Sequence, residues 1–165
     1  MRRPATRRQI LTTTALLCAC AGLAATCCVS LGSAVAASAA EAVHPVKISQ
    51  AQVAGAIFED YKPVVKTEDG NTTHDVEVFL SKDRQFDAGM YRSEKVRAEI
   101  KTPYGVNEYM HFLEGGVTLT SSDGTVTEVR AGDSVVIPED WTGIWDTEGY
   151  TKIYVIYSPG GQITE

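Results

Sequence analysis

Cysteine is absent from most of this 165-residue chain, because its four cysteines all lie between Cys18 and Cys28. The region beyond Cys28 therefore has no disulfide, no cysteine zinc site and no thiol nucleophile. Histidine is almost as scarce, since the chain contains only His44, His74 and His111. Three histidines and no nucleophile-elbow motif leave no Ser-His-Asp arrangement to propose.

Basic residues are also scarce beyond the first 40 positions. Four of the 15 Lys and Arg residues lie in the first 40 positions, and all 21 acidic residues follow them, so the remainder has a net charge of −10. An acidic body of this kind argues against nucleic acid and anionic membrane surfaces as partners. The chain also lacks internal repeats and low-complexity segments. About 125 residues beyond the first 40 favour one domain.

The first 40 residues have the pattern of a secretory signal peptide. A basic start that includes Arg7-Arg8 precedes an apolar run over Ile10–Leu31, and two small-x-small cleavage sites follow at residues 34–36 and 37–39. The arginine pair resembles the twin-arginine export signal of bacteria. We expect the mature protein to begin between Val35 and Glu41 and to be periplasmic or secreted.

Two alternatives to cleavage remain open. The apolar run is long enough for an uncleaved membrane anchor, since about 20 apolar residues span a bilayer. Leu17-Cys18-Ala19-Cys20 loosely resembles a lipobox, although it lies early in the apolar run. Without an anchor, we expect no membrane association after cleavage.

The rest of the chain divides into three parts: an N-terminal extension over residues 41–75, an all-β barrel over 76–158 and a C-terminal tail over 159–165. In the extension, Ser49 is a suitable N-cap for a short helix that ends at Asp60. The polar segment Thr67–Thr73 is predicted to be a loop.

From Val76 onward, short runs rich in Val, Ile, Tyr and Thr alternate with turn residues, and Asp123-Gly124 signals a tight hairpin. Many short strands without a long helical pattern indicate a sandwich or a small barrel. The predicted strands are Val76–Leu80, Ala88–Arg92, Val96–Lys101, Glu108–Leu113, Val117–Ser121, Thr125–Val129, Ser134–Ile137, Gly143–Asp146 and Lys152–Tyr157.

Five motifs give this region a family resemblance. They are Asp83-x-x-Phe86-x-x-Gly89-Met90-Tyr91, Glu108-x4-Leu113-Glu114-Gly115, Gly132-Asp133-x4-Pro138, Trp141-x-Gly143-x-Trp145 and Lys152-Ile153-Tyr154-Val155. Together they resemble the cupin superfamily, and within it the subfamily of ureidoglycine aminohydrolase and ethanolamine-utilisation cupins. The resemblance implies a single jelly-roll barrel. It also implies a homodimer, because similar cupins pair through an outer sheet face.

The resemblance also implies a metal site whose ligands are mostly missing here. Cupins usually hold a metal with two histidines and a glutamate from the first motif and one histidine from the second. The glutamate corresponds to Glu108. The histidine positions hold Thr102 and Tyr104, or Lys101 and Pro103 with a longer spacer, and Gly143 in the second motif. We therefore expect no tightly bound transition metal and no other cofactor.

His111 is a poor substitute for the missing ligands. Side chains alternate between the faces of a strand, so Glu108, Met110 and Phe112 should share the inner face while His111 points outward. Without a metal, the interior is predicted to hold a pocket lined by Tyr91, Lys101, Tyr104, Glu108, Met110 and Trp145. A carboxylate beside a lysine or tyrosine in such a pocket can transfer a proton, which makes Glu108 the candidate catalytic residue.

Three functions fit these features. The first is binding of a small organic metabolite without a metal. The second is an enzyme of hydrolase, lyase or isomerase type that acts on a small nitrogenous or carboxylated metabolite. The third is an accessory barrel filled by its own side chains, as small barrels often are. A cavity of several hundred Å³ would favour the first two.

Overall fold

The computed structural model describes residues 42–161 and residue 163. The predicted signal peptide lies outside these residues. Within the described part, no helix is long and apolar enough to cross a membrane.

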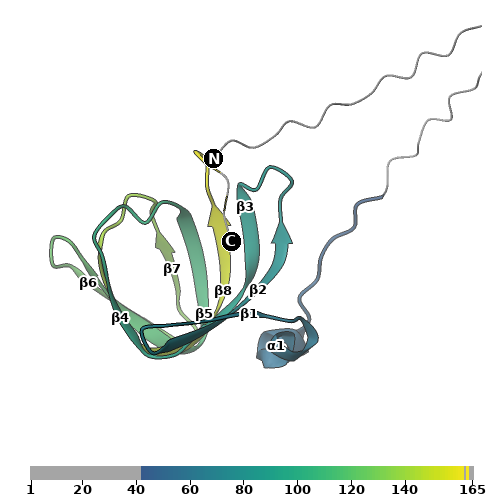
Figure 1. The fold of residues 1–165 in the computed structure, drawn as a ribbon, viewed down its shortest axis with the longest axis horizontal. Helices are drawn as coiled ribbons and strands as arrows, with labels where there is room; N and C mark the ends of the chain where they lie inside the picture. Colours follow the sequence, from purple (N-terminus) through teal and green to yellow (C-terminus); the bar gives the residue numbers. More distant parts are fainter. Residues whose placement is uncertain (1–41, 162, 164–165) are drawn as a thin grey trace, which may run out of the picture. The chain divides into compact units, whose positions relative to one another are not determined.

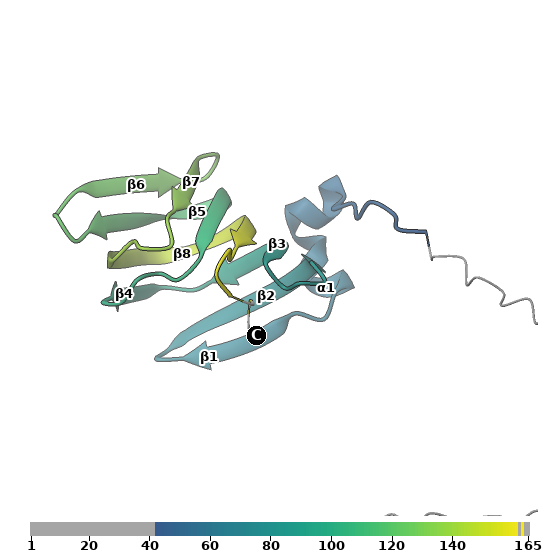
Figure 2. The same ribbon diagram turned by 90° about the horizontal axis from the view of Figure 1, so that it is seen from above.

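The described chain forms one antiparallel sheet of eight strands that curls around an interior (Figures 1 and 2). The strand order is β1-β2-β3-β8-β5-β6, while β4 pairs with β8 and β7 pairs with β5. This arrangement confirms the predicted all-β class with a single jelly-roll barrel. The strands are β1 (Val64–Glu68), β2 (Asn71–Leu80), β3 (Phe86–Ser93), β4 (Val96–Ile100), β5 (Asn107–Ser121), β6 (Val126–Arg130), β7 (Ser134–Ile137) and β8 (Gly143–Tyr157).

Two long strands, β5 and β8, connect the two halves of the barrel. Sequence analysis predicts each as two short strands, which is wrong: they pair continuously, with register shifts between Phe112 and Glu114 and again between Gly116 and Thr118. At the first irregularity the backbones approach so closely that a Cβ at Gly115 would lie 2.0 Å from the Gly149 oxygen. Glycine here permits a bend inside a strand rather than a turn between strands.

The sheet also begins earlier than predicted. The segment Thr67–Thr73 is not a loop, because β1 and β2 pair from Glu68↔Asn71 onward and form a hairpin with Asp69 and Gly70 at its tip. All five residues of β1 are exposed. A strand without a buried face carries no hydrophobic alternation, so the pattern that identifies strands was missing here.

A short helical segment precedes the sheet and includes a π-helical turn η1 (Gln52–Ala56) and α1 (Ile57–Asp60). The predicted cap is confirmed: the N–H of Gln52 donates to Ser49 Oγ at 3.3 Å and the N–H of Ser49 donates to Gln52 Oε1 at 2.8 Å. This reciprocal pair is a capping box. Gly55, with φ of 113°, has a non-helical backbone and kinks the segment inside η1.

The two faces of the sheet have separate apolar cores. Ile57 and Phe58 of α1 pack against Val76 and Met90, which are paired neighbours on β2 and β3. The larger core fills part of the barrel interior and consists of Met110, Phe112, Val117, Leu119, Val129, Ile137, Trp145, Tyr150 and Tyr154. Because side chains alternate along each strand, the residues next to the outer core, such as Asp75 and Tyr91, point into the barrel.

Candidate ligand-binding site in the barrel

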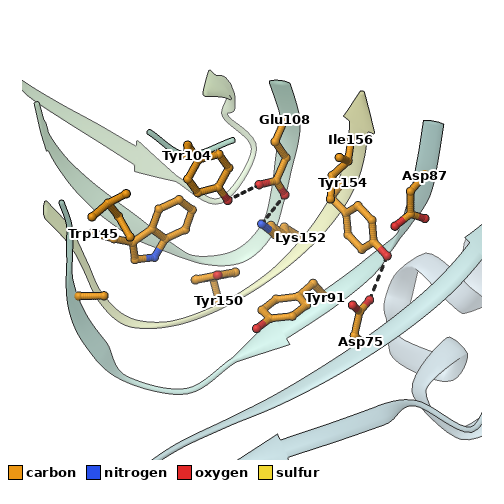
Figure 3. Close-up of a pocket in the computed structure, with 12 residues that line it drawn as sticks. Asp75, Asp87, Tyr91, Tyr104, Glu108, Trp145, Tyr150, Lys152, Tyr154 and Ile156 are labelled. Carbon is orange, nitrogen blue, oxygen red and sulfur yellow. Dashed lines mark hydrogen bonds and ion pairs between the residues drawn. The ribbon is translucent and has the colours of Figure 1, made fainter. Parts of the chain in front are cut away.

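The barrel contains a cavity of about 330 Å³ (Figure 3). Five strands and the loop between β4 and β5 contribute to its wall. Its lining residues are Asp75, Asp87, Tyr91, Ala98, Ile100, Tyr104, Glu108, Trp145, Tyr150, Lys152, Tyr154 and Ile156. Aromatic rings make up much of this wall, and every ionisable side chain on it comes from an inward-facing strand position or from the Tyr104 loop.

A buried polar triad lies at one end of the cavity. Lys152 Nζ is 2.7 Å from Glu108 Oε1, and the side chains of these two residues are only 6% and 4% exposed. The hydroxyl of Tyr104 donates a hydrogen bond of 2.5 Å to Glu108 Oε2. Both carboxylate oxygens of Glu108 are thus occupied by protein donors.

Tyr104 is held in place although it lies in a loop. Its backbone N–H donates to the carbonyl of Trp141 at 3.1 Å, and its ring contacts the Trp141 ring edge-on at 6.3 Å between centroids. Burial, followed by the charge of Glu108, raises the pKa of the Tyr104 hydroxyl well above its usual value. The phenol therefore stays protonated and acts as a donor to the carboxylate.

The ammonium of Lys152 is also surrounded by aromatic rings. Its Nζ lies 5.3 Å from the centroid of Tyr91, 5.5 Å from Trp145 and 5.6 Å from Tyr150. Cation–π attraction between the ammonium and the rings acts at these distances. Nζ also lies 3.0 Å from the sulfur of Met110.

A second polar cluster, formed by Asp75, Asp87 and Tyr154, lies elsewhere on the cavity wall (Figure 3). The Tyr154 hydroxyl donates to Asp75 Oδ1 at 3.0 Å. Asp87 is 6% exposed, and its Oδ1 is buried without a hydrogen-bond partner among the described residues. Burial, and then the charges of Glu77 and Asp75, raise the pKa of Asp87 to about 6.

The same cluster depends on a glycine. Gly89 and Tyr154 are paired neighbours on β3 and β8, and a Cβ at Gly89 would lie 2.6 Å from the Tyr154 hydroxyl and 2.2 Å from the Val76 carbonyl oxygen. The missing side chain leaves room for the Tyr154 ring to lie across the strand.

Burial raises the pKa of Asp75 in spite of the hydrogen bond from Tyr154, so this end of the cavity penalises negative charge.

The structure brings together four of the six predicted pocket residues: Tyr91, Tyr104, Glu108 and Trp145 all line the cavity. Met110 faces the interior as predicted, but it is fully buried in the core beneath Lys152. The prediction that Lys101 lines this pocket is wrong. Ala98 and Ile100 of β4 line the cavity, whereas the Lys101 side chain is 74% exposed and pairs with Glu99 at 3.2 Å.

Sequence reasoning missed the lysine that does approach Glu108, and it missed the acidic cluster. Lys152, Tyr154 and Ile156 occupy alternate positions of the predicted strand over 152–157, so they share one face. A lysine at an inward position of an otherwise apolar strand was the available signal. Only the pairing of β5 with β8 shows that this face meets Glu108.

The residues present do not fit the metal of the wider superfamily. Glu108 is already held by Lys152 and Tyr104. A Cβ at Gly143 would lie 2.2 Å from the Thr120 oxygen, so the backbone has no room for a side chain at the second-motif histidine position. His111 lies on the opposite face of β5 from Glu108, with Nδ1 3.0 Å from Ser134 Oγ. No group of three or more metal-binding side chains occurs in residues 42–161 and 163.

Comparison with known proteins identifies the fold. Residues 80–154 match the family model of the EutQ-like cupin domain. A protein of unknown function in the DUF861 family from Pseudomonas syringae has a similar structure, with a TM-score of 0.50 and 20% identity over 56% of this chain. The match spans only 39% of the Pseudomonas chain. The EutQ protein of Clostridium difficile aligns with a TM-score of 0.48 and 15% identity, over 58% of this chain and 76% of its own. No curated protein matches the sequence.

Proposed function

We propose that this chain, whose residues 80–154 match the EutQ-like cupin domain, is an exported protein that binds one small organic metabolite inside the barrel, without a metal. The observation that supports this proposal is the cavity of about 330 Å³, lined by aromatic rings with polar clusters on its wall. Small-molecule sites have volumes of about 300–1,000 Å³ and combine an apolar wall with a few placed polar groups. A barrel filled by its own side chains would lack such a space.

The size of the cavity restricts the ligand. Its volume lies near the lower limit for small-molecule sites, so we propose a compact metabolite rather than an oligomer or a dinucleotide. The rings of Trp145 and Tyr91 offer flat apolar contacts. Tyr104 and Tyr154 carry hydroxyls that can orient polar groups of a ligand.

A thermal-shift screen of small metabolites on the purified protein tests the proposal. A ligand that binds only the folded state at 100 times its Kd stabilises the protein by about 2.7 kcal/mol, which raises Tm measurably. The variant Ala98→Phe fills the cavity from β4 and should abolish the response to any hit. Ala131→Phe, at an exposed turn, is the matched control and should keep the response. A hit that stabilises Ala98→Phe as strongly as the natural protein would place binding outside the barrel and refute the proposal.

The triad of Glu108, Lys152 and Tyr104 favours a second candidate function, that of an enzyme. A carboxylate with a phenol at 2.5 Å and an ammonium at 2.7 Å can exchange a proton with a bound substrate. We propose Glu108 as the acid/base group of such a reaction, which would be of hydrolase, lyase or isomerase type. If a screening hit is converted, the product appears by NMR. Glu108→Gln should then slow conversion far more than it weakens binding, whereas Glu128→Gln on the outer surface should change neither. Equal rates in Glu108→Gln and the natural protein would refute this role.

We also propose that the protein forms a homodimer through an outer sheet face. Tyr109 and Val136 are paired neighbours on β5 and β7, and they are 43% and 60% exposed. Two apolar side chains at one place on an outer face favour an association that covers them.

A further inference from the structure

The charges on the cavity wall are unequal. Three carboxylates, those of Asp75, Asp87 and Glu108, face one ammonium, that of Lys152. The ammonium is already paired with Glu108 at 2.7 Å. Of the ion pairs among the described residues, none includes Asp75 or Asp87. The acidic cluster therefore lacks a cation of its own.

Asp87 is the carboxylate of this cluster that most clearly lacks a donor. Its Oδ1 is buried and has no hydrogen-bond partner in the described part of the chain, although the residue as a whole is 6% exposed. Buried polar groups are almost always hydrogen-bonded, so an oxygen on a cavity wall that has no partner among the described residues favours a partner supplied by a bound molecule. That partner must be a donor, because a carboxylate oxygen accepts.

The surrounding groups favour a charged donor over a neutral one. Burial raises the pKa of Asp75, of Asp87 and of the Tyr154 hydroxyl near them, and the charges of the two carboxylates raise the pKa of Tyr154 further. Glu77 adds negative charge near Asp87. The cations that act on Asp75 are Lys152 and Lys66, and neither is within hydrogen-bonding distance of it. A bound cation would lower the energy of both carboxylates at once.

The remaining wall defines the rest of the ligand. Ala98, Ile100, Trp145 and Ile156 are apolar and line the same cavity. A carboxylated ligand would add a fourth negative charge while the single lysine is already occupied. The chemistry therefore suits a molecule with one ammonium group on a compact apolar body.

Building on the proposed function, we propose that the ligand of this cavity is a small organic cation, a protonated amine, whose ammonium group binds between Asp75 and Asp87. The amine donates to the free oxygen of Asp87 and to Asp75, which Tyr154 holds in position. The apolar body lies against Trp145 and the β4 residues Ala98 and Ile100.

Isothermal titration with three compounds of the same shape tests the charge preference on the purified natural protein. Benzylammonium, benzyl alcohol and benzoate share one ring and differ in the charge of the attached group. At pH 7.5 we expect benzylammonium to bind at least tenfold more tightly than benzyl alcohol, and benzoate to bind more weakly than both. The advantage of benzylammonium should shrink at pH 5, because protonation of Asp87 removes its negative charge, while binding of benzyl alcohol should not change.

Two variants locate the effect. Asp87→Asn keeps the size of the side chain and should remove most of the tenfold advantage of the ammonium compound. Asp60→Asn, at the exposed end of α1, is the matched control and should leave all three affinities unchanged. If Asp87→Asn does not fold, the ranking of the three compounds on the natural protein still decides the question.

The outcomes separate this inference from the proposed function. If benzyl alcohol or benzoate binds as tightly as benzylammonium, or if the screen yields only neutral or anionic ligands that Ala98→Phe excludes, the cationic ligand is refuted and the binding function stands. If no compound of any charge binds, both are refuted. Tight binding of benzylammonium that Asp87→Asn leaves unchanged would also refute the assignment to this cluster.

Discussion

Removal of the Lys152 ammonium should destabilise the protein severely. The variant Lys152→Met keeps the length of the side chain but leaves the Glu108 carboxylate with Tyr104 as its remaining bonded partner. The two charged side chains are 6% and 4% exposed, so solvent does not replace the lost partner. Breaking a buried ion pair by removing one member costs about 3–5 kcal/mol. For a domain of this size, each kcal/mol lowers Tm by about 3–5 °C, so the expected loss is about 9–25 °C.

A double-mutant cycle measured by urea unfolding isolates the interaction itself. Glu108→Gln combined with Lys152→Met removes both charges and should be more stable than Lys152→Met alone, because no uncompensated carboxylate remains buried. Lys95→Met breaks an ion pair of similar geometry on the surface, where the side chains are 70% and 82% exposed. This control should leave the unfolding midpoint unchanged.

The cycle also shows what would refute the reasoning. If Lys152→Met costs no more than Lys95→Met, the ion pair contributes nothing beyond a surface contact. Glu108→Gln alone lowers the free energy of unfolding by some amount. If it lowers the free energy of unfolding of Lys152→Met by the same amount, the two residues act independently. Either result would contradict the view that the ammonium is the counter-charge of Glu108.

Four further predictions follow from other parts of the molecule. Gly89→Ala should destabilise the fold by about 1–3 kcal/mol in urea unfolding, the usual cost of overpacking, because the new Cβ displaces Tyr154 or the backbone. The folded-state pKa of Asp87 is raised to about 6 from 3.8, so its ionisation opposes folding increasingly as pH rises between these values. Asp87→Asn should therefore stabilise the ligand-free protein by about 1–2 kcal/mol at pH 7.5, and much less at pH 4, in melting experiments. Val136→Glu should convert dimer to monomer in sedimentation, and a natural protein that is monomeric at micromolar concentration would contradict the dimer. N-terminal sequencing of exported material should begin between residues 35 and 41, and an intact Met1 would favour a membrane anchor.

Local sequence patterns predicted most of the barrel and the direction of Glu108. Alternation along one strand was sufficient to place Glu108 inside and His111 outside, and both positions are confirmed. The Asp123-Gly124 hairpin is also confirmed, since β5 and β6 pair across it. These features depend on residues that are close together in the chain, which is the information that a single sequence contains.

The failures have two physical causes. The strand β1 was missed because its exposed residues show no hydrophobic alternation. The strand β5 was divided into two around Gly115 because the partner of this glycine in the close approach, Gly149, is distant in the sequence. Lys101 was expected near Glu108 because it occupies the position of a missing metal ligand in the first motif. The true neighbour, Lys152, is 44 positions away and reaches Glu108 only through the pairing of β5 with β8.

These long-range contacts explain why the two polar clusters of the cavity have different roles. The chain supplies its own cation to Glu108, and Tyr104 occupies the second oxygen, so the hydrogen-bonding needs of that carboxylate are met within the fold. Asp87 is also buried, but its Oδ1 has no hydrogen-bond partner among the described residues. A buried carboxylate without a partner destabilises the empty protein, whereas one that gains a partner on binding contributes directly to ligand affinity. The Glu108 end is therefore suited to hold the barrel together and to exchange protons, while the Asp87 end is suited to select the ligand.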